Sequence, residues 1–367
     1  MFDRRLVAYF DWGLLGLTII LSTIGVVTIY SAVNAGGNTF QHTLYIKQII
    51  WLGAGAMGMA VCFMVGYKRF DQYAMVLYVG CLGLLATVLI FGKHVAGSQR
   101  WLALGPVSIQ PSEMMKVVLI IALAHYYSRH LRPHGLTLRE LVQPMVIVAL
   151  PFVLIIKQPD LGTAMMLVLI AGSMTLFCGI GRRTLIMFVT AGAVSLPVLW
   201  SMLKAYQKQR ILTFLNPERD PLGAGYHIIQ SKIAIGSGGV AGKGYLEGTQ
   251  NILSFLPEQH TDFIFSVLSE EWGFIGAGLV IFLFLLILLW GLSIANKCRD
   301  PFGILMAVGI VAFIFWEMFI NIGMVMGLMP VVGVPLPLIS YGGSSTITIL
   351  MAVGLLINVS MRRFMFE

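Results

Sequence analysis

The chain has 367 residues, of which 58% are hydrophobic and only 11% are charged. Soluble domains usually carry about 25% charged residues, so this composition excludes an ordinary soluble domain and indicates an integral membrane protein. The net charge of +8 does not indicate nucleic-acid binding, because the basic residues sit in short connections between apolar segments, where they determine topology. The four cysteines predict no disulfide framework or metal cluster, since three lie inside apolar segments and the fourth in a short basic loop.

Ten apolar runs long enough to cross a membrane follow one another along the chain. They lie near residues 12–32, 46–66, 70–92, 112–128, 141–157, 161–180, 184–204, 263–294, 302–326 and 343–361. The first run is too long for the core of a typical signal peptide, so we expect it to remain as the first helix. The prediction is an all-α integral membrane protein with about ten transmembrane helices in a single polytopic domain, residues 1–367.

The distribution of basic residues predicts the orientation of these helices. Ten spans place both termini on one side, and the connections on that side contain thirteen Lys and Arg residues, against four in the short connections of the other side. Connections rich in Lys and Arg stay in the cytoplasm, so both termini are expected there. The long segment at about 205–262, between helices 7 and 8, then forms one extracytoplasmic loop.

The long loop contains two features of its own. Residues 220–235 include an amphipathic stretch suited to a membrane surface. The glycine-rich run 236–244 resembles a phosphate-binding loop, but it lacks the first Gly and the Ser/Thr of a Walker motif and has no βαβ unit around it. We therefore interpret the run as a series of tight turns.

Asp262 stands where the long loop meets the next apolar run. A carboxylate costs several kcal/mol at membrane depth unless it is hydrated or paired, so one at this boundary is a candidate functional residue. His260 and Thr261 directly precede it and are candidates for substrate binding, although a loop histidine is more often only solvated.

The segment 110–116 begins the fourth apolar run and carries two charges. Ser112 is placed to cap the helix, with Glu113 in the first turn, where the helix dipole favours an anion. Lys116 lies three residues further on the same face. The two residues form either a structural ion pair or the lining of a cavity for a polar headgroup, and we favour the cavity. Glu317, inside the ninth run, receives no assignment.

Two short outward connections carry further candidates. Asp160 follows Pro159 and either caps the sixth helix or holds a neighbouring basic residue. Arg100 suits a phosphate or pyrophosphate, because the guanidinium group matches those oxygen atoms. Trp101, beside it, is an interface anchor or a substrate contact.

The segment 335–345 contains two prolines, two glycines and three serines just before the tenth run. Irregular backbone at membrane depth is tolerated only where it is buried in protein or lines a wet cavity. A structural re-entrant turn is one interpretation. We favour a cavity wall that includes Ser340, Gly342 and Gly343 on the same side as Asp262.

Four of these segments together resemble the SEDS family of bacterial cell-wall polymerases (shape, elongation, division and sporulation proteins). The matching segments, in the family's order, are 110–113, 159–164, 260–265 and 335–343. The loop sequence 225–239 resembles the elongation members of the family more than the division members. The resemblance covers essentially the whole chain.

The resemblance implies a ten-helix peptidoglycan glycosyltransferase that polymerises lipid II at the outer face of the bacterial inner membrane during cell elongation. By position in the motif, the family's essential aspartate corresponds to Asp262. The family's cavity-lining residues correspond to Trp101, Glu113, Lys116 and Asp160. The implied partners are undecaprenyl-linked glycan, a class B penicillin-binding protein that acts as transpeptidase, and other rod-elongation proteins.

The expected chemistry joins a sugar hydroxyl to an anomeric carbon and releases undecaprenyl pyrophosphate. A sugar hydroxyl is a weak nucleophile, so Asp262 is our candidate for the general base. Arg100, Lys116 or Arg210, a divalent cation such as Mg²⁺ or Mn²⁺, or both, would stabilise the leaving pyrophosphate.

Two competing hypotheses involve no chemistry. One is a lipid II flippase, since charged residues at membrane depth also suit a carrier. The other is a structural scaffold for partner proteins, which fits poorly with several polar motifs on one outward face.

Overall fold

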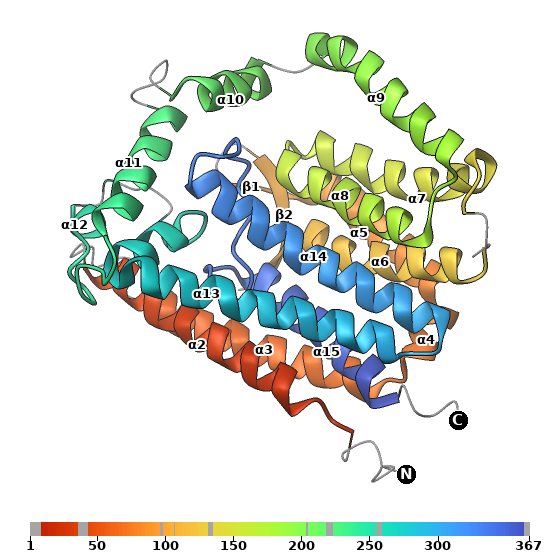
Figure 1. The fold of residues 1–367 in the computed structure, drawn as a ribbon, viewed down its shortest axis with the longest axis horizontal. Coiled ribbons are helices and arrows are strands. Elements are labelled where there is room, and N and C mark those ends of the chain that lie inside the picture. Colours follow the sequence, from red (N-terminus) through yellow and green to blue (C-terminus); the bar gives the residue numbers. More distant parts are fainter. Residues whose placement is uncertain are drawn as a thin grey trace.

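The structure is a computed structural model. It describes residues 9–35, 43–95, 98–105, 107–130, 135–202, 205–217, 223–253, 255 and 259–362. Figure 1 shows a bundle of long helices, with α9, α10 and α11 along one of its sides.

Ten helices of the described chain are long. They are α2 (Trp12–Asn34), α3 (Leu44–Met64), α5 (Ala74–Phe91), α6 (Pro111–Ser128), α7 (Leu138–Lys157), α8 (Leu161–Cys178), α9 (Arg182–Met202), α13 (Ile264–Lys297), α14 (Pro301–Val325) and α15 (Gly343–Arg362). The shorter helices are α4 (Tyr67–Gln72), α10 (Ala205–Leu215), α11 (Ala224–Ser237) and α12 (Thr249–Ile252).

Each of the ten apolar runs falls on one of the ten long helices, so the predicted all-α membrane fold is confirmed. Eight of these helices are apolar enough over their length to cross a membrane; the other two are α6 and α9. Helix α6 carries a Glu–Lys pair near its start, which lowers its mean hydropathy. Helices α14 and α15 are the most buried of the eight and pack against α6, α8, α13 and α3, so they form the centre of the bundle.

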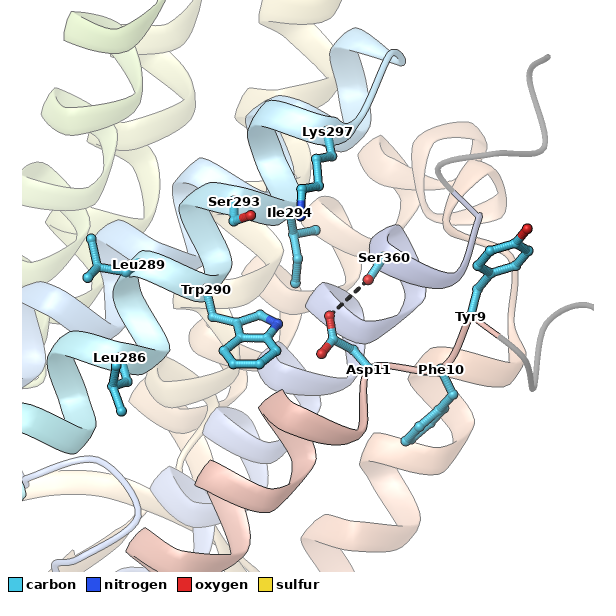
Figure 2. A pocket seen from close by; sticks show the side chains of 10 residues that line it. All are labelled: Tyr9, Phe10, Asp11, Leu286, Leu289, Trp290, Ser293, Ile294, Lys297 and Ser360. Atoms are coloured by element: carbon cyan, nitrogen blue, oxygen red, sulfur yellow. Dashed lines mark hydrogen bonds between the residues drawn. The ribbon is translucent and has the colours of Figure 1, made fainter.

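The first and last spans begin and end at the same end of the bundle. The Ser360 hydroxyl near the end of α15 donates a hydrogen bond of 3.0 Å to Asp11, which caps the start of α2. Lys297, the last residue of α13, lines the same cavity as these two residues (Figure 2). We call this the terminal end of the bundle. The chain therefore enters its first long helix and leaves its last one at the same end of the bundle.

A small antiparallel sheet stands between α5 and α6, where the sequence predicted a loop. It consists of β1 (Lys93–Val95), β2 (Ser98–Leu104) and β3 (Val107–Ile109), in the order β1-β2-β3. Trp101 on β2 pairs with Lys93, and Leu102 pairs with Ile109. β1 and β3 have only three residues each, and β2 has three polar residues followed by four apolar ones, so none of them shows the alternation that predicts a strand.

The segment predicted as one long loop contains α10, α11 and α12. Helix α11 packs on α13 and α14: Ser231 lies 2.8 Å from the Ser266 hydroxyl and donates to the carbonyl of Val325 at 2.6 Å. The membrane position of this segment stays a prediction.

The glycine run that follows α11 forms turns, as predicted, and these turns fit against a break in α13. Gly273 interrupts α13 with a φ of 64°. The Phe274 amide donates to the carbonyl of Gly239 at 2.9 Å, and the Gly244 amide donates to the carbonyl of Glu271 at 3.1 Å. A Cβ atom added at Gly242 would overlap the Glu271 carbonyl. The run therefore satisfies backbone groups that the break would otherwise leave exposed.

We expect the Gly242→Ala substitution to destabilise the protein. Gly242 has a φ of 85° and no room for a side chain, and a non-glycine residue in such a conformation costs about 1–3 kcal/mol before any clash. Thermal unfolding of the purified protein measures the effect. The control is Gly236→Ala, because a Cβ there meets nothing within 4 Å; equal melting temperatures for the two variants would contradict this account of the run.

Candidate functional site

The turn before α13 and the segment 335–343 lie against each other at the end of the bundle opposite the terminal end. The Ser340 hydroxyl donates to the carbonyl of Thr261 at 2.6 Å, and the Tyr341 amide donates to the carbonyl of His260 at 2.9 Å. The rings of His260 and Tyr341 lie 5.8 Å apart. Two motifs about 80 residues apart in the sequence are thus joined by hydrogen bonds, and we call this the motif end.

Asp262 is positioned through its backbone by a buried asparagine of α14. The Asn321 side chain donates to the carbonyl of Asp262 at 3.0 Å and to the carbonyl of Val334 at 2.8 Å. Gly333 neighbours the carboxylate: a Cβ there would lie in ordinary contact, 3.4 Å from Oδ2 of Asp262. Asp262 is partly exposed and precedes the first residue of α13 by two positions. A helix N-terminus stabilises negative charge, which suits a carboxylate at this point.

The irregular segment is also held from α3. The Gln48 side chain donates to the carbonyl of Ser340 at 3.3 Å and accepts from the amide of Gly342 at 3.3 Å. Gly343 packs against Trp51, because a Cβ at Gly343 would lie 2.6 Å from the indole ring. Burial raises the pKa of Tyr341, partly opposed by a hydrogen bond with Trp51, so its hydroxyl remains protonated at neutral pH.

Asp160 has both roles that the sequence left open. It caps α8 by accepting hydrogen bonds from the amide of Thr163 at 3.2 Å and from its hydroxyl at 3.0 Å. It also lies 3.7 Å from the Arg100 guanidinium, which donates to the carbonyls of Gln158, at 3.2 Å, and Pro159. Arg100 therefore holds the turn between α7 and α8.

Gln110 connects Asp160 to the start of α15. Its side chain donates to Asp160 at 3.0 Å, and its amide donates to the Ser344 hydroxyl at 3.0 Å. Since Ser340 contacts Thr261, the segment 340–344 joins the Asp262 turn on one side to the Asp160 and Arg100 group on the other.

Glu113, Lys116 and Glu317 form a buried ionic cluster inside the bundle. The Lys116 ammonium lies 2.9 Å from the Glu113 carboxylate, also contacts Glu317, and sits 5.0 Å from the centre of the Phe313 ring. All three charged residues are almost inaccessible, and Oε2 of Glu317 has no partner among the described residues.

Glu317 and Asn321 are one helical turn apart on α14, so they share a face of that helix. The ionic cluster therefore lies about 6 Å deeper in the bundle than the asparagine that holds Asp262.

Two predicted residues, Trp101 and Arg210, lie outside this hydrogen-bonded network, and one residue without an assignment, Glu317, has a defined place. Trp101 is half-buried on β2, next to Arg100, but its side chain makes no hydrogen bond that the structure describes. Arg210 lies on α10, and the structure describes no hydrogen bond or ion pair between its side chain and the motifs. Glu317, which the sequence analysis left unassigned, is the second anion of the cluster.

Sequence reasoning missed Gln48, Gln110 and Asn321, which hold the motifs together. One signal could have found two of them: Gln48 and Asn321 are polar side chains inside otherwise apolar runs. Such residues usually face the interior and have a partner.

Two cavities described in the structure lie away from Asp262. One of about 550 Å³ opens at the terminal end, where Asp11, Trp290 and Lys297 line it (Figure 2). A second of about 490 Å³ is apolar and lies between α7 and α8, with Phe152 and Tyr127 in its wall. Neither of them is the cavity predicted beside Asp262, which stays a prediction.

Comparison with known proteins gives consistent results. The FtsW/RodA/SpoVE family model, described as "Cell cycle protein", matches residues 12–364. The chain is 44% identical to the peptidoglycan glycosyltransferase MrdB of Escherichia coli K12, covering 88% of this chain and 86% of that protein. It is 37% identical to the peptidoglycan glycosyltransferase RodA of Treponema pallidum, covering 98% and 99% of the two chains.

Solved structures show the same fold. A chain of a peptidoglycan synthase complex that coordinates polymerization and crosslinking matches with a TM-score of 0.83 and 33% identity, over 97% of this chain and 98% of that chain. RodA of Thermus thermophilus matches with a TM-score of 0.71 and 28% identity, over the same shares of the two chains.

We expect Lys116→Met to destabilise the protein strongly, because it leaves the Glu113 and Glu317 carboxylates buried without a cation. Removing one partner from a buried ion pair typically costs about 3–5 kcal/mol. Chemical or thermal unfolding in detergent measures the loss. Replacing both carboxylates as well, in Lys116→Met with Glu113→Gln and Glu317→Gln, should restore most of it.

The matched control for this experiment is Arg129→Met, which removes a half-exposed ion pair of 3.3 Å with Asp71. Exposed pairs contribute at most about 1 kcal/mol. If Lys116→Met loses no more stability than Arg129→Met, the cluster is not the buried ionic contact described above.

Proposed function

The chain belongs to the FtsW/RodA/SpoVE family, and on that basis we propose that it is a peptidoglycan glycosyltransferase that polymerises lipid II. The observation that carries the proposal is its 44% identity, over 88% of its length, to a relative named as such an enzyme. The geometry of the motif end supports it, because the segments 260–265, 335–343, 110–113 and 159–164 are joined there by hydrogen bonds.

In the proposed reaction, a hydroxyl of one lipid-linked sugar attacks the anomeric carbon of a growing glycan. The bond from that carbon to undecaprenyl pyrophosphate breaks, and the hydroxyl proton passes to a base. Asp262 is the proposed base, since it is partly exposed and fixed through its backbone by Asn321. A positioned base contributes about 10²–10⁴-fold to such a rate.

Arg100 is the better candidate of two cations for the leaving pyrophosphate. A guanidinium group has five N–H donors, and the described contacts of Arg100 leave some of them available on a side chain that is 29% exposed. Lys116 is buried and already paired with two carboxylates. We infer that Lys116 neutralises the two buried carboxylates instead of the pyrophosphate. Glu113 and Asp160 are then inferred to orient the polar groups of the cavity wall.

A divalent cation, Mg²⁺ or Mn²⁺, would neutralise charge on the pyrophosphate. The described part of the chain contains no group of three or more His, Cys, Asp or Glu side chains arranged for a metal. A cation at the reaction centre would therefore take most of its ligands from water and pyrophosphate, as Mg²⁺ commonly does, with Asp262 as the protein's contribution.

The proposal includes a location and a partner. By the distribution of Lys and Arg, the terminal end faces the cytoplasm and the motif end faces outward, across the inner membrane. A class B penicillin-binding protein is the proposed partner in cell elongation, supported by the similarity to a chain from a peptidoglycan synthase complex.

The test is glycan synthesis from lipid II by the purified protein with its penicillin-binding partner, whose transpeptidase is blocked. We expect Asp262→Asn to reduce chain synthesis at least about 100-fold, since the reaction loses its base. The product is resolved by chain length, and binding of the partner confirms that the variant is folded. Glu247→Gln, which changes an exposed carboxylate of the same loop, is the matched control and should retain full activity.

Two outcomes would contradict this proposal in different ways. Normal synthesis by Asp262→Asn would remove Asp262 from the base role while leaving the enzyme assignment intact. A wild-type protein that makes no glycan but moves lipid II across vesicle membranes would be a flippase.

A further inference from the structure

Buried side-chain oxygen atoms without a hydrogen-bond partner among the described residues gather beside α13, two turns beyond Asp262. They belong to Glu270, Glu271, Asn251 and Gln250: Oε2 of each glutamate, Oδ1 of the asparagine and Oε1 of the glutamine. Glu270 and Asn251 are 0% exposed and Glu271 is 2% exposed. An unpaired acceptor in such a place is costly unless a cation or a donor satisfies it.

The contacts of these residues place them in one cluster. The backbone amide of Gln250 donates to Oε1 of Glu270 at 3.0 Å. The side-chain amide of Asn251 lies 3.5 Å from Oε1 of Glu271. Gly248 faces both carboxylates: a Cβ there would lie 2.9 Å from Oε2 of Glu270 and 3.4 Å from Cγ of Glu271. A side chain at Gly248 would therefore crowd the unpaired oxygen atom of Glu270.

The charges of the cluster do not balance. The Lys243 ammonium lies 2.6 Å from Oε1 of Glu270. Among the described residues, it is the cationic side chain that contacts either of the two carboxylates. The donors described for Glu271 are all neutral: the Ser31 hydroxyl, the Asn251 side-chain amide and the backbone amide of Leu246. Two buried carboxylates therefore share one ammonium group, and buried charge normally requires pairing or a metal.

We propose that Glu270, Glu271, Asn251 and Gln250 bind a hard divalent cation. The candidate ligands are all oxygen atoms, from two carboxylates and two amide carbonyls, which is the ligand chemistry of Ca²⁺ and Mg²⁺. Ca²⁺ accepts about six to eight oxygen ligands in irregular arrangements that include Asn and Gln carbonyls, so it suits this set better than Mg²⁺. This site is separate from the reaction centre, because Asp262 is not one of its ligands.

The proposed cation would lie where five segments of the motif end meet. Asn251 of α12 donates to the carbonyl of Ser31, near the end of α2, at 3.1 Å. Gln259, in the turn that leads to Asp262, donates to the carbonyl of Ala32 at 2.7 Å. Lys243 of the glycine run contacts Glu270 of α13. A cation held by the two glutamates thus stabilises the framework on which the Asp262 turn rests.

The test compares thermal unfolding of the purified full chain in EDTA with unfolding in about 1 mM Ca²⁺ or Mg²⁺. Extracellular Ca²⁺ modules have dissociation constants up to about this concentration. We expect Ca²⁺ to raise the melting temperature by about 2–4 °C or more and Mg²⁺ to raise it less. Glu271→Gln should abolish the response to Ca²⁺. Two controls should keep it: Glu247→Gln, an exposed carboxylate of the same loop, and Asp262→Asn, at the reaction centre.

A second measurement keeps the proposal testable if Glu271→Gln does not fold. Tb³⁺, which replaces Ca²⁺ in oxygen sites, should show luminescence excited through the neighbouring Trp272 and displaced by Ca²⁺. Gln250→Ala, a milder change, should weaken Ca²⁺ binding several-fold. The proposal is overturned if wild type shows neither a Ca²⁺-dependent melting temperature nor Tb³⁺ luminescence, or if Asp262→Asn loses the response while Glu271→Gln keeps it.

The readout is folding and ion binding, so the result does not depend on whether the protein polymerises lipid II. Loss of activity in Asp262→Asn with an intact Ca²⁺ response would support both proposals. An intact Ca²⁺ response in a protein that only transports lipid II would leave the cation site standing alone.

Discussion

The need to pair every buried polar group determines how the motif end is built. Between α14 and α15 the chain forms no regular helix, and irregular backbone at such a depth is tolerated only where other protein groups satisfy it. Gln48 from α3, Asn321 from α14 and the Ser340 hydroxyl supply these partners. Because two of these side chains, Ser340 and Asn321, also contact the carbonyls of Thr261 and Asp262, the groups that satisfy the irregular segment also position the candidate base.

The buried charges also need partners, and an unpaired buried charge costs more free energy than an unpaired neutral polar group. Glu113 and Glu317 come from different helices and meet at one lysine, so the ionic cluster ties α6 to α14 in the centre of the bundle. A buried ion pair adds little net stability compared with apolar packing, but it is costly to break and it disfavours other arrangements of the helices. Its position, one turn below Asn321, connects the packing of the core to the placement of Asp262.

The sequence predicted the parts of the fold that depend on local composition. Each long helix matches an apolar run, because hydropathy over about twenty residues decides whether a segment can cross a membrane. Asp160 as a cap and the pairing of Glu113 with Lys116 were also predictable, since both depend on residues within one turn. The partner of Glu317 was not, because it lies 201 positions away in the sequence. The sheet β1–β3 escaped prediction because its strands have three to seven residues.

Helix α13 shows why the long loop cannot be understood apart from the spans. Its 34 residues correspond to about 51 Å, well beyond a hydrocarbon core of about 30 Å. The part after Gly273 is long enough to cross by itself, so the part before it, with Glu270 and Glu271, extends past the apolar span toward the motif end. There the glycine run covers the break, and Lys243 meets Glu270. A single uninterrupted helix would leave these carboxylates without such partners. The break therefore gives the glycine run backbone partners on α13 and places Lys243 beside Glu270 at the motif end.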